Sequence, residues 1–206
     1  LQISEDGMAW SAPGELIQTT APYARLTARD PPSGIELISG LAVNASPTQF
    51  ASLEPATTLL LHFNEGAGAQ AFDSGPFSST ASFGGAPAWV AGRFGTALDF
   101  TGSQTVVAPV ANRVNKGPFV IETWVYPTDN VGPHQIAGKV GGVNSFFSLD
   151  TFNGKLTASV AKANQVHTLT APEPLALNQW SLVAMSFDGT RLRLFINGEQ
   201  RRALAA

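Results

Sequence analysis

Cysteine is absent from the 206 residues, which excludes disulfides, thiolate metal ligands and thiol nucleophiles. Charged residues make up only 13% of the chain, about half the usual share of a soluble domain. The 12 basic residues are outnumbered by 15 acidic ones, which argues against a nucleic-acid-binding face, since such faces need clustered lysine and arginine. No segment approaches the roughly 18 consecutive apolar residues of a membrane-spanning helix, so membrane insertion is not expected.

Helical periodicity is also nearly missing, and the 20 glycines and 14 prolines are scattered through the chain, where they would break long helices. The sequence instead contains short runs in which apolar residues alternate with a period of two and a turn follows. The clearest are residues 120–126, ended by Pro127, residues 180–187, ended by Asp188-Gly189, and residues 191–196, ended by Asn197-Gly198. Asp-Gly and Asn-Gly between such runs predict β-hairpins, because type I′ turns need positive φ angles.

The last of these runs shows which face is buried. Leu192, Leu194 and Ile196 point one way and Arg191 and Arg193 the other, which predicts one buried and one solvated face. The predicted fold class is therefore all-β, an antiparallel β-sandwich.

The chain divides into two blocks. Residues 1–45 hold predicted strands near residues 1–4, 23–29 and 35–43, and we interpret them as the end of an upstream β-sandwich module. The polar, proline-marked residues 46–56 are predicted to be a linker, and residues 57–206 a second domain. Because the chain begins at Leu1 rather than methionine, we expect it to be part of a longer protein.

The second block has an ordered succession of motifs: LLLHFNEGAG at 59–68, AFDSG at 71–75, GRFGTALDF at 92–100, FVIETWVYP at 119–127, WSLVA at 180–184, and FDGT through LFINGE at 187–199. This succession resembles the laminin-G-like domains of the concanavalin A-like lectin/glucanase superfamily. The resemblance implies a jelly-roll sandwich over residues 57–206 and an extracellular or surface-exposed protein. Residues 1–45 resemble, less specifically, the last strands of a discoidin-type or fibronectin-type module.

The sequence departs from the family pattern at its end. Family members usually carry several more strands after the Asn-Gly-Glu turn, whereas only residues 200–206 follow here. We therefore expect C-terminal strands to be missing and the sheet to have an open edge after Asn197-Gly198. Such an edge invites pairing with a strand of another subunit.

Catalysis is not expected. Glycoside hydrolases of related folds use two carboxylates flanking the sugar, but Glu122 stands alone on its predicted strand. His62, His134 and His167 lie in ordinary strand or loop contexts, and no Gly-x-Ser-x-Gly motif occurs.

A metal site is a second candidate. Residues 64–74 supply Asn64, Glu65 and Asp73 among small residues, and calcium prefers carboxylate and carbonyl oxygens on irregular loops. Laminin-G-like domains often bind calcium near the sheet rim, so the resemblance makes Glu65 and Asp73 candidate metal ligands and calcium the candidate cofactor. The alternative is that Asp73-Ser74-Gly75 is an Asx turn.

Aromatic and polar residues in loops are the candidates for ligand binding. Trp124 and Trp180 belong to strand motifs and are interpreted as core residues. Trp89, Asn144 and Phe146 lie in or near glycine-containing segments, where binding residues on a rigid sandwich tend to lie, and they are the predicted ligand contacts.

The predicted function is non-catalytic recognition or adhesion, in which a surface-displayed module binds a glycan or a protein. It would belong to a bacterial surface protein or to a phage tail fibre or tip, where repetition turns weak contacts into avidity. Two alternatives stay open. One is an assembly domain that pairs with itself or with other subunits through its open edge. The other is an accessory carbohydrate-binding domain of a glycoside hydrolase.

Overall fold

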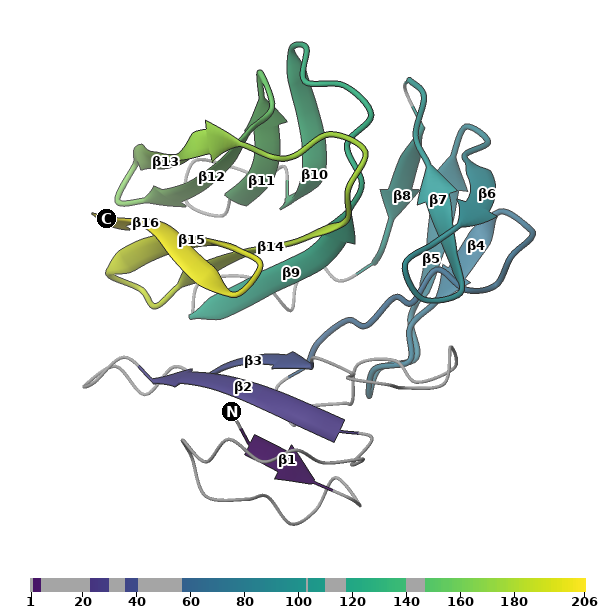
Figure 1. Cartoon of the computed structure of the whole chain (residues 1–206), viewed down its shortest axis with the longest axis horizontal. Coiled ribbons are helices and arrows are strands. Elements are labelled where there is room, and N and C mark those ends of the chain that lie inside the picture. Colours follow the sequence, from purple (N-terminus) through teal and green to yellow (C-terminus); the bar gives the residue numbers. More distant parts are fainter. Residues whose placement is uncertain are drawn as a thin grey trace. The chain divides into compact units, whose positions relative to one another are not determined.

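Figure 1 shows the computed structural model, which describes residues 2–4, 23–29, 36–40, 57–102, 104–109, 118–139 and 147–206. All regular elements in these ranges are β-strands, which confirms the predicted all-β class. The chain forms two compact units, Leu1–Arg113 and Val114–Ala206. Their boundary lies inside the predicted 57–206 domain, and the predicted domain limits stay predictions. The described part of the chain holds no helix that is long and apolar enough to cross a membrane.

The first unit contains three small antiparallel sheets. One has the order β1-β2-β3, another β4-β5-β8, and the last pairs β6 with β7. Their bounds are β1 Gln2–Ser4, β2 Tyr23–Arg29, β3 Glu36–Gly40, β4 Gln70–Phe72, β5 Thr80–Gly84, β6 Ala88–Ala91, β7 Thr96–Asp99 and β8 Thr105–Val107. β1, β2 and β3 lie where strands were predicted, whereas the predicted linker at 46–56 lies outside the described residues.

The second unit is a sandwich of two four-stranded antiparallel sheets, with orders β10-β11-β12-β13 and β16-β15-β14-β9, which appear as two facing layers in Figure 1. Their bounds are β9 Phe119–Val125, β10 Pro133–Lys139, β11 Phe147–Phe152, β12 Lys155–Lys162, β13 Gln165–Pro174, β14 Ser181–Phe187, β15 Arg191–Ile196 and β16 Glu199–Ala205. Alternate side chains of both sheets meet between the layers, as a period of two requires.

The core lies between these two sheets. Leu149 and Leu156 from one sheet and Val183, Met185 and Leu192 from the other are all 0% exposed. Burying a side chain of this size contributes roughly 1.5–3 kcal/mol to stability. The core therefore fixes the positions from which the loops of this unit start.

The predicted turns agree with the structure in part. Asn197 and Gly198 have φ angles of 53° and 80°, so the Asn-Gly turn between β15 and β16 has the positive angles that a type I′ turn needs. At Asp188-Gly189 only the glycine has a positive φ, of 94°. There the Asp188 carboxylate accepts hydrogen bonds from the Thr190 and Arg191 amides instead.

The open edge predicted after Asn197-Gly198 is not found there. Residues 199–205 form β16, which pairs with β15 and places Leu204 opposite Leu192. The edge of this sheet therefore lies one strand further along the chain. β16 carries Glu199, Arg201 and Arg202 with exposed side chains, and charged side chains on an edge strand oppose pairing with other chains.

The solvated face predicted for β15 is also partly wrong, because Arg193 is buried and only Arg191 is exposed. Nη1 of Arg193 lies 2.8 Å from Oδ2 of Asp188, and the two side chains are 7% and 8% exposed. Burial opposes ionisation of Asp188, but hydrogen bonds from Thr190, Arg191 and Arg193 outweigh it and hold the pKa of Asp188 well below its usual range. Arg193 tolerates burial because this carboxylate neutralises it.

Candidate functional site

The predicted metal residues Glu65 and Asp73 lie on either side of β4 in the first unit, Glu65 in the loop before this strand and Asp73 directly after it. Asp73 is buried, and its Oδ1 accepts hydrogen bonds from the Leu60 and Gly75 amides at 2.8 and 2.7 Å. Its Oδ2 accepts a third from the Ser79 amide at 3.2 Å. The Gly75 bond spans two residues, as in an Asx turn. Asp73 therefore links the backbone at Leu60 to the backbone at Gly75 and Ser79.

The carboxylate of Asp73 is already used in the fold of this region. Its two oxygens accept three amide hydrogen bonds, which take up most of the roughly four acceptor sites of an ionised carboxylate. Glu65 uses Oε1 to accept the Phe72 amide at 2.8 Å, and its buried Oε2 has no hydrogen-bond partner. Among the described residues no group of three or more histidines and carboxylates could hold a metal ion. Calcium stays a prediction that this geometry does not support.

The predicted ligand contact Trp89 lies against the loop before β4. Its indole nitrogen donates to the Gly68 carbonyl at 3.0 Å, and its ring centre lies 5.8 Å from that of Phe83. The side chain is half-buried in β6, so only part of the ring faces solvent. Asn144 and Phe146 lie outside the described residues. The structure thus brings Trp89 against the loop before β4, which also carries Glu65.

The candidate catalytic residues are not brought together into a recognisable catalytic arrangement. Glu122 is exposed on β9, opposite Ala184 of β14. Burial lowers the pKa of His62, an effect that the nearby Glu65 carboxylate opposes. His134 lies in a loop network of the second unit, and His167 lies on β13.

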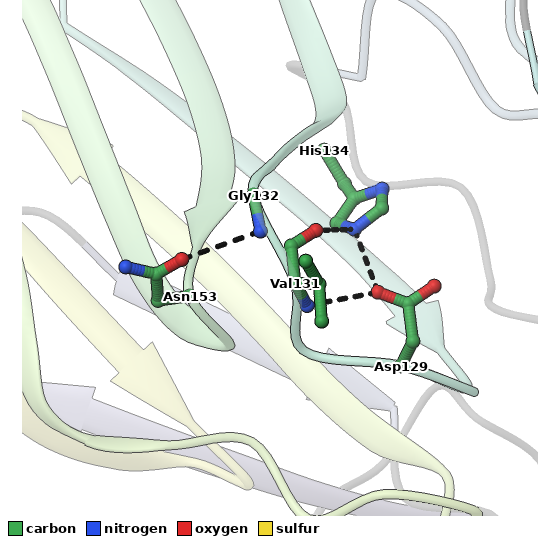
Figure 2. A network of polar contacts seen from close by, with 5 residues as sticks. All are labelled: Asp129, Val131, Gly132, His134 and Asn153. Carbon is green, nitrogen blue, oxygen red and sulfur yellow. Dashed lines mark hydrogen bonds and ion pairs between the residues drawn. The ribbon is translucent and has the colours of Figure 1, made fainter.

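That loop network lies at the β9–β10 loop and the β11–β12 turn (Figure 2). The Asp129 carboxylate accepts the Val131 amide at 2.9 Å and lies 3.0 Å from Nε2 of His134, which also approaches the Val131 carbonyl at 2.9 Å. The Val131 hydrogen bond, with a smaller contribution from His134, holds the pKa of Asp129 below its usual range. Asn153 accepts the Gly132 amide at 3.2 Å. The network joins this largely exposed loop to the β11–β12 turn.

Backbone hydrogen bonds join this loop to two others at one end of the sandwich. The Asn153 amide donates to Gly132, the Leu175 amide to Gly154, and the Asn178 amide to Pro127, at 3.0, 2.8 and 2.8 Å. The β9–β10 loop, the β11–β12 turn and the β13–β14 loop therefore form one connected group. We call it the loop end.

A hollow of about 300 Å³ lies beside the loop end. It is lined by the end of β13, the β13–β14 loop and the β15–β16 turn, through Ala171, Pro172, Glu173, Pro174, Leu175, Ala176, Gln179, Trp180, Ser181, Ile196, Asn197 and Arg201. A volume of this size is at the lower limit of typical small-molecule sites.

The lining divides into an apolar part and a polar part. Ala171 and Leu175 are buried, Ile196 is half-buried, and Trp180 packs its ring 5.4 Å from that of Tyr126. Polar groups come from exposed residues such as Glu173 and Gln179 and from Arg201, which pairs with Glu199 at 3.0 Å. Glu173 is the one carboxylate among the lining residues, so the hollow lacks the carboxylate pair of a glycoside hydrolase.

Sequence reasoning missed this hollow because it assigned Trp180 to the core. Trp180 precedes β14, which starts at Ser181, and it is half-buried. Its place at the first position of the alternating run 180–187, next to the preceding loop, was the signal that it need not point into the core. The Asn153-Gly154 turn was also overlooked, although its dipeptide predicts a hairpin.

Comparison with known proteins identifies the family pattern. The sequence matches the family model of the concanavalin A-like lectin/glucanases superfamily over residues 100–205, just over half of the chain. Among curated proteins, none matches it.

Similar solved structures include two neurotoxin structures and one domain of a hydrolase. The binding domain of botulinum neurotoxin DC, in complex with rat synaptotagmin II, is 14% identical with a TM-score of 0.55, over 72% of this chain and 39% of that chain. Botulinum neurotoxin type C, whose cell entry depends on interaction with two ganglioside molecules, is 14% identical with a TM-score of 0.51, over 69% and 39%.

The third is domain 4 of AbnA, a GH43 extracellular arabinanase from Geobacillus stearothermophilus, in complex with arabinotriose. It is 18% identical with a TM-score of 0.49, over 61% of this chain and 65% of that chain. This chain therefore matches less than two thirds of the length of each of the three structures. At these identities the likeness shows the fold alone.

Proposed function

Because the chain belongs to the concanavalin A-like lectin/glucanases superfamily, we propose that it is a non-catalytic recognition module that binds a glycan residue in the hollow beside Trp180. The observation that carries this proposal is that the hollow is lined by both apolar and polar side chains. A sugar ring has the same division, with C–H groups on its faces and hydroxyl groups around its edge. Trp180 and Leu175 suit the faces, and Glu173, Gln179 and Arg201 suit the hydroxyl groups.

The fold by itself supports binding without choosing the ligand. The two neurotoxins with TM-scores above 0.5 are described with a protein, rat synaptotagmin II, and with ganglioside molecules. We favour a glycan here because the hollow is small, concave and rich in hydrogen-bonding groups. A protein partner would need a larger buried area, of about 800 Å² on each side.

The setting that suits such a module is a surface outside the cell, on a bacterial surface protein or a phage tail fibre or tip. Repetition on such a surface would raise the avidity of a shallow site. The charged edge at β16 gives the assembly alternative little support.

A glycan array followed by calorimetry tests the proposal. The whole chain is applied with calcium and with EDTA, and the strongest hit is titrated into wild type, Gln179→Ala and Trp180→Ala. Leu177→Ala is the matched control, since Leu177 is on the same loop and 38% exposed but does not line the hollow. We expect both lining variants to lose at least fivefold in affinity and the control to keep it. An array without signal in either buffer, or a hit that both lining variants bind like wild type, would refute the proposal.

A further inference from the structure

Ser181 is the most deeply buried polar residue in the lining of the hollow. It is 4% exposed, whereas the charged and amide residues of the same lining are exposed. Ser181 is the first residue of β14. Because side chains alternate along a strand, it points to the same side of the sheet as Val183, which belongs to the hydrophobic core. The hydroxyl group of Ser181 therefore points between the two sheets.

This hydroxyl group has no hydrogen-bond partner in the part of the chain that the structure describes. It is also not sealed inside the protein. Among the described residues, the fully enclosed side-chain atoms without a partner are Oε2 of Glu65 and Nε of Arg193, so Oγ of Ser181 is reached from the hollow. A buried polar group without a partner costs free energy. A ligand that supplies the partner of Ser181 therefore gains affinity.

The buried residues around this hydroxyl group are apolar. Ala171 and Leu175 of the lining belong to the hydrophobic core, and Ile196 packs against it. In the register of the sheet, Ser181 lies opposite Val125 of β9, which also packs against the core. We call the part of the hollow lined by Ser181, Ala171, Leu175 and Ile196 its inner part. The inner part combines an apolar wall with one hydroxyl group.

The charged residues of the lining are more exposed than Ser181. Glu173 and Arg201 are both exposed, and the Arg201 guanidinium lies 3.0 Å from the Glu199 carboxylate. A charged group of a ligand that reached the inner part would lose its hydration without meeting an opposite charge among the described residues there, which is costly. The inner part therefore suits an uncharged group with one hydroxyl on an apolar carbon.

Asn197 provides a fixed polar group near Ser181. Its backbone amide donates to the Leu182 carbonyl at 2.7 Å, and its Oδ1 accepts the Leu182 amide at 2.9 Å. These two hydrogen bonds hold the Asn197 side chain against the residue that follows Ser181. Since Oδ1 is used in this way, Nδ2 keeps its N–H groups for a ligand hydroxyl.

We propose that Ser181 determines the specificity of the hollow by receiving the exocyclic hydroxymethyl group of an uncharged hexose. This inference rests on the proposed function and names the class of sugar that the hollow takes. The methylene carbon of the hydroxymethyl group suits the apolar wall, and its hydroxyl suits Oγ of Ser181. Xylose and 6-deoxy sugars lack this hydroxyl, so they would leave Oγ without a partner and should bind more weakly.

Nuclear magnetic resonance titration of the ¹⁵N-labelled whole chain with two matched pairs of methyl glycosides tests this role. One pair is methyl β-D-glucopyranoside and methyl β-D-xylopyranoside, and the other is methyl β-D-galactopyranoside and methyl β-D-fucopyranoside. The members of each pair differ only in the exocyclic group. We expect at least one hexoside to shift the amide signals of Ser181 and Asn197 and to bind about fivefold or more tightly than the other member of its pair.

Substitutions on β14 then assign the preference to Ser181. Ser181→Ala should weaken binding of the hexoside about fivefold or more and leave the affinity for the other member of the pair within about twofold. Ser186→Ala is the matched control, since Ser186 is 1% exposed on the same strand and does not line the hollow, and it should keep the preference. The urea midpoint of Ser181→Ala should not fall below that of wild type, because the substitution removes a hydroxyl without a partner.

The outcomes separate this inference from the proposed function. Equal affinities within both pairs, or a preference that Ser181→Ala keeps, would overturn the role of Ser181 and leave glycan binding in the hollow standing. A loss of affinity in Ser181→Ala that is equal for both members of a pair, or a lower urea midpoint, would indicate a structural role and also overturn it. If no glycoside shifts signals around the hollow, the hydroxymethyl assignment is wrong, and a charged glycan found on the array would still support the proposed function.

Discussion

The ion pair of Asp188 and Arg193 shows how a single carboxylate can stabilise a buried guanidinium inside the sandwich unit. Asp188 accepts hydrogen bonds from the Thr190 and Arg191 amides as well as from the guanidinium of Arg193. Substituting Asp188→Ala would leave that guanidinium buried without its carboxylate. We expect a loss of about 3 kcal/mol in the free energy of unfolding, measured by urea denaturation. Glu199→Ala, which breaks an exposed pair with Arg201, should cost no more than about 1 kcal/mol.

The same pair predicts a pH dependence. Because folding lowers the pKa of Asp188, the stability it provides is complete above the ordinary aspartate pKa of about 4. That stability falls as the pH drops below this value and the carboxylate takes up a proton. The difference in unfolding free energy between wild type and Asp188→Ala should therefore be constant from neutral pH to about pH 5 and shrink in more acidic solution. A difference that grows on acidification would contradict the assignment.

Asp73 is the second residue whose role can be tested, and its test bears on calcium. Asp73→Ala would leave the amides of Leu60, Gly75 and Ser79 without their acceptor. At roughly 1–3 kcal/mol for each buried donor that loses its partner, we expect much faster hydrogen exchange at these three amides. Removing calcium with EDTA should leave exchange in wild type unchanged. Faster exchange in EDTA would show that a metal ion holds the loop.

At the scale of single strands and turns, the sequence predicted three of the eight strands described in the second unit. The alternating runs at 120–126, 180–187 and 191–196 became β9, β14 and β15, because their strong period of two matches the sandwich. The position of β16 was harder to predict. Residues 199–205 alternate weakly, and the pairing of β16 with β15 depends on the preceding Asn197-Gly198 turn rather than on its own pattern.

The β11–β12 turn provides a prediction for an element. Gly154 has a φ of 74°, and a Cβ there would lie 2.8 Å from Cβ of Asn130 and 3.2 Å from Cβ of Pro174. Gly154→Ala should therefore destabilise the protein by about 2 kcal/mol or more. It should also weaken ligand binding in the hollow, because Pro174 and Leu175, which contact Gly154, line it. Gly189→Ala is the control, since Gly189 also has a positive φ but open space around it. Equal losses in both variants would show that the φ angle alone matters.

The edge strand β16 provides a second prediction for an element. Its exposed Arg201 and Arg202 should keep neighbouring molecules from pairing with it. Replacing both by threonine removes the charges and raises the preference for extended structure. We expect the double variant to associate more strongly than wild type in sedimentation velocity experiments at equal concentration. Equal association of the two proteins would mean that the charges do not protect this edge.

For the molecule as a whole, the alternation pattern predicted the fold class better than the site. Period-two runs that end in turn residues, in a chain with little helical periodicity, indicate β-structure, and all regular elements of the described residues are strands. The hollow could not be predicted, because its lining comes from three segments that meet only after the two sheets have packed.

The low charge of the molecule predicts how binding responds to salt. The lining of the hollow has one acidic and one basic residue, Glu173 and Arg201, and the net charge of the chain is −3. Exposed charges are largely screened between about 0.05 M and 0.5 M salt. Glycan affinity measured by calorimetry should therefore change by less than about twofold across this range. A tenfold loss at high salt would indicate an anionic ligand instead.

The loop end has a consequence for how such a module could diversify. Hydrogen bonds that join its three loops use backbone groups of Gly132, Gly154 and Pro127 as acceptors, so they do not depend on most of the side chains there. Side chains of the β13–β14 loop, such as Gln179, could therefore change during evolution while the loops keep their arrangement. A scaffold of this kind would be a suitable starting point for a combinatorial library in which new ligand specificities are selected without redesigning the core.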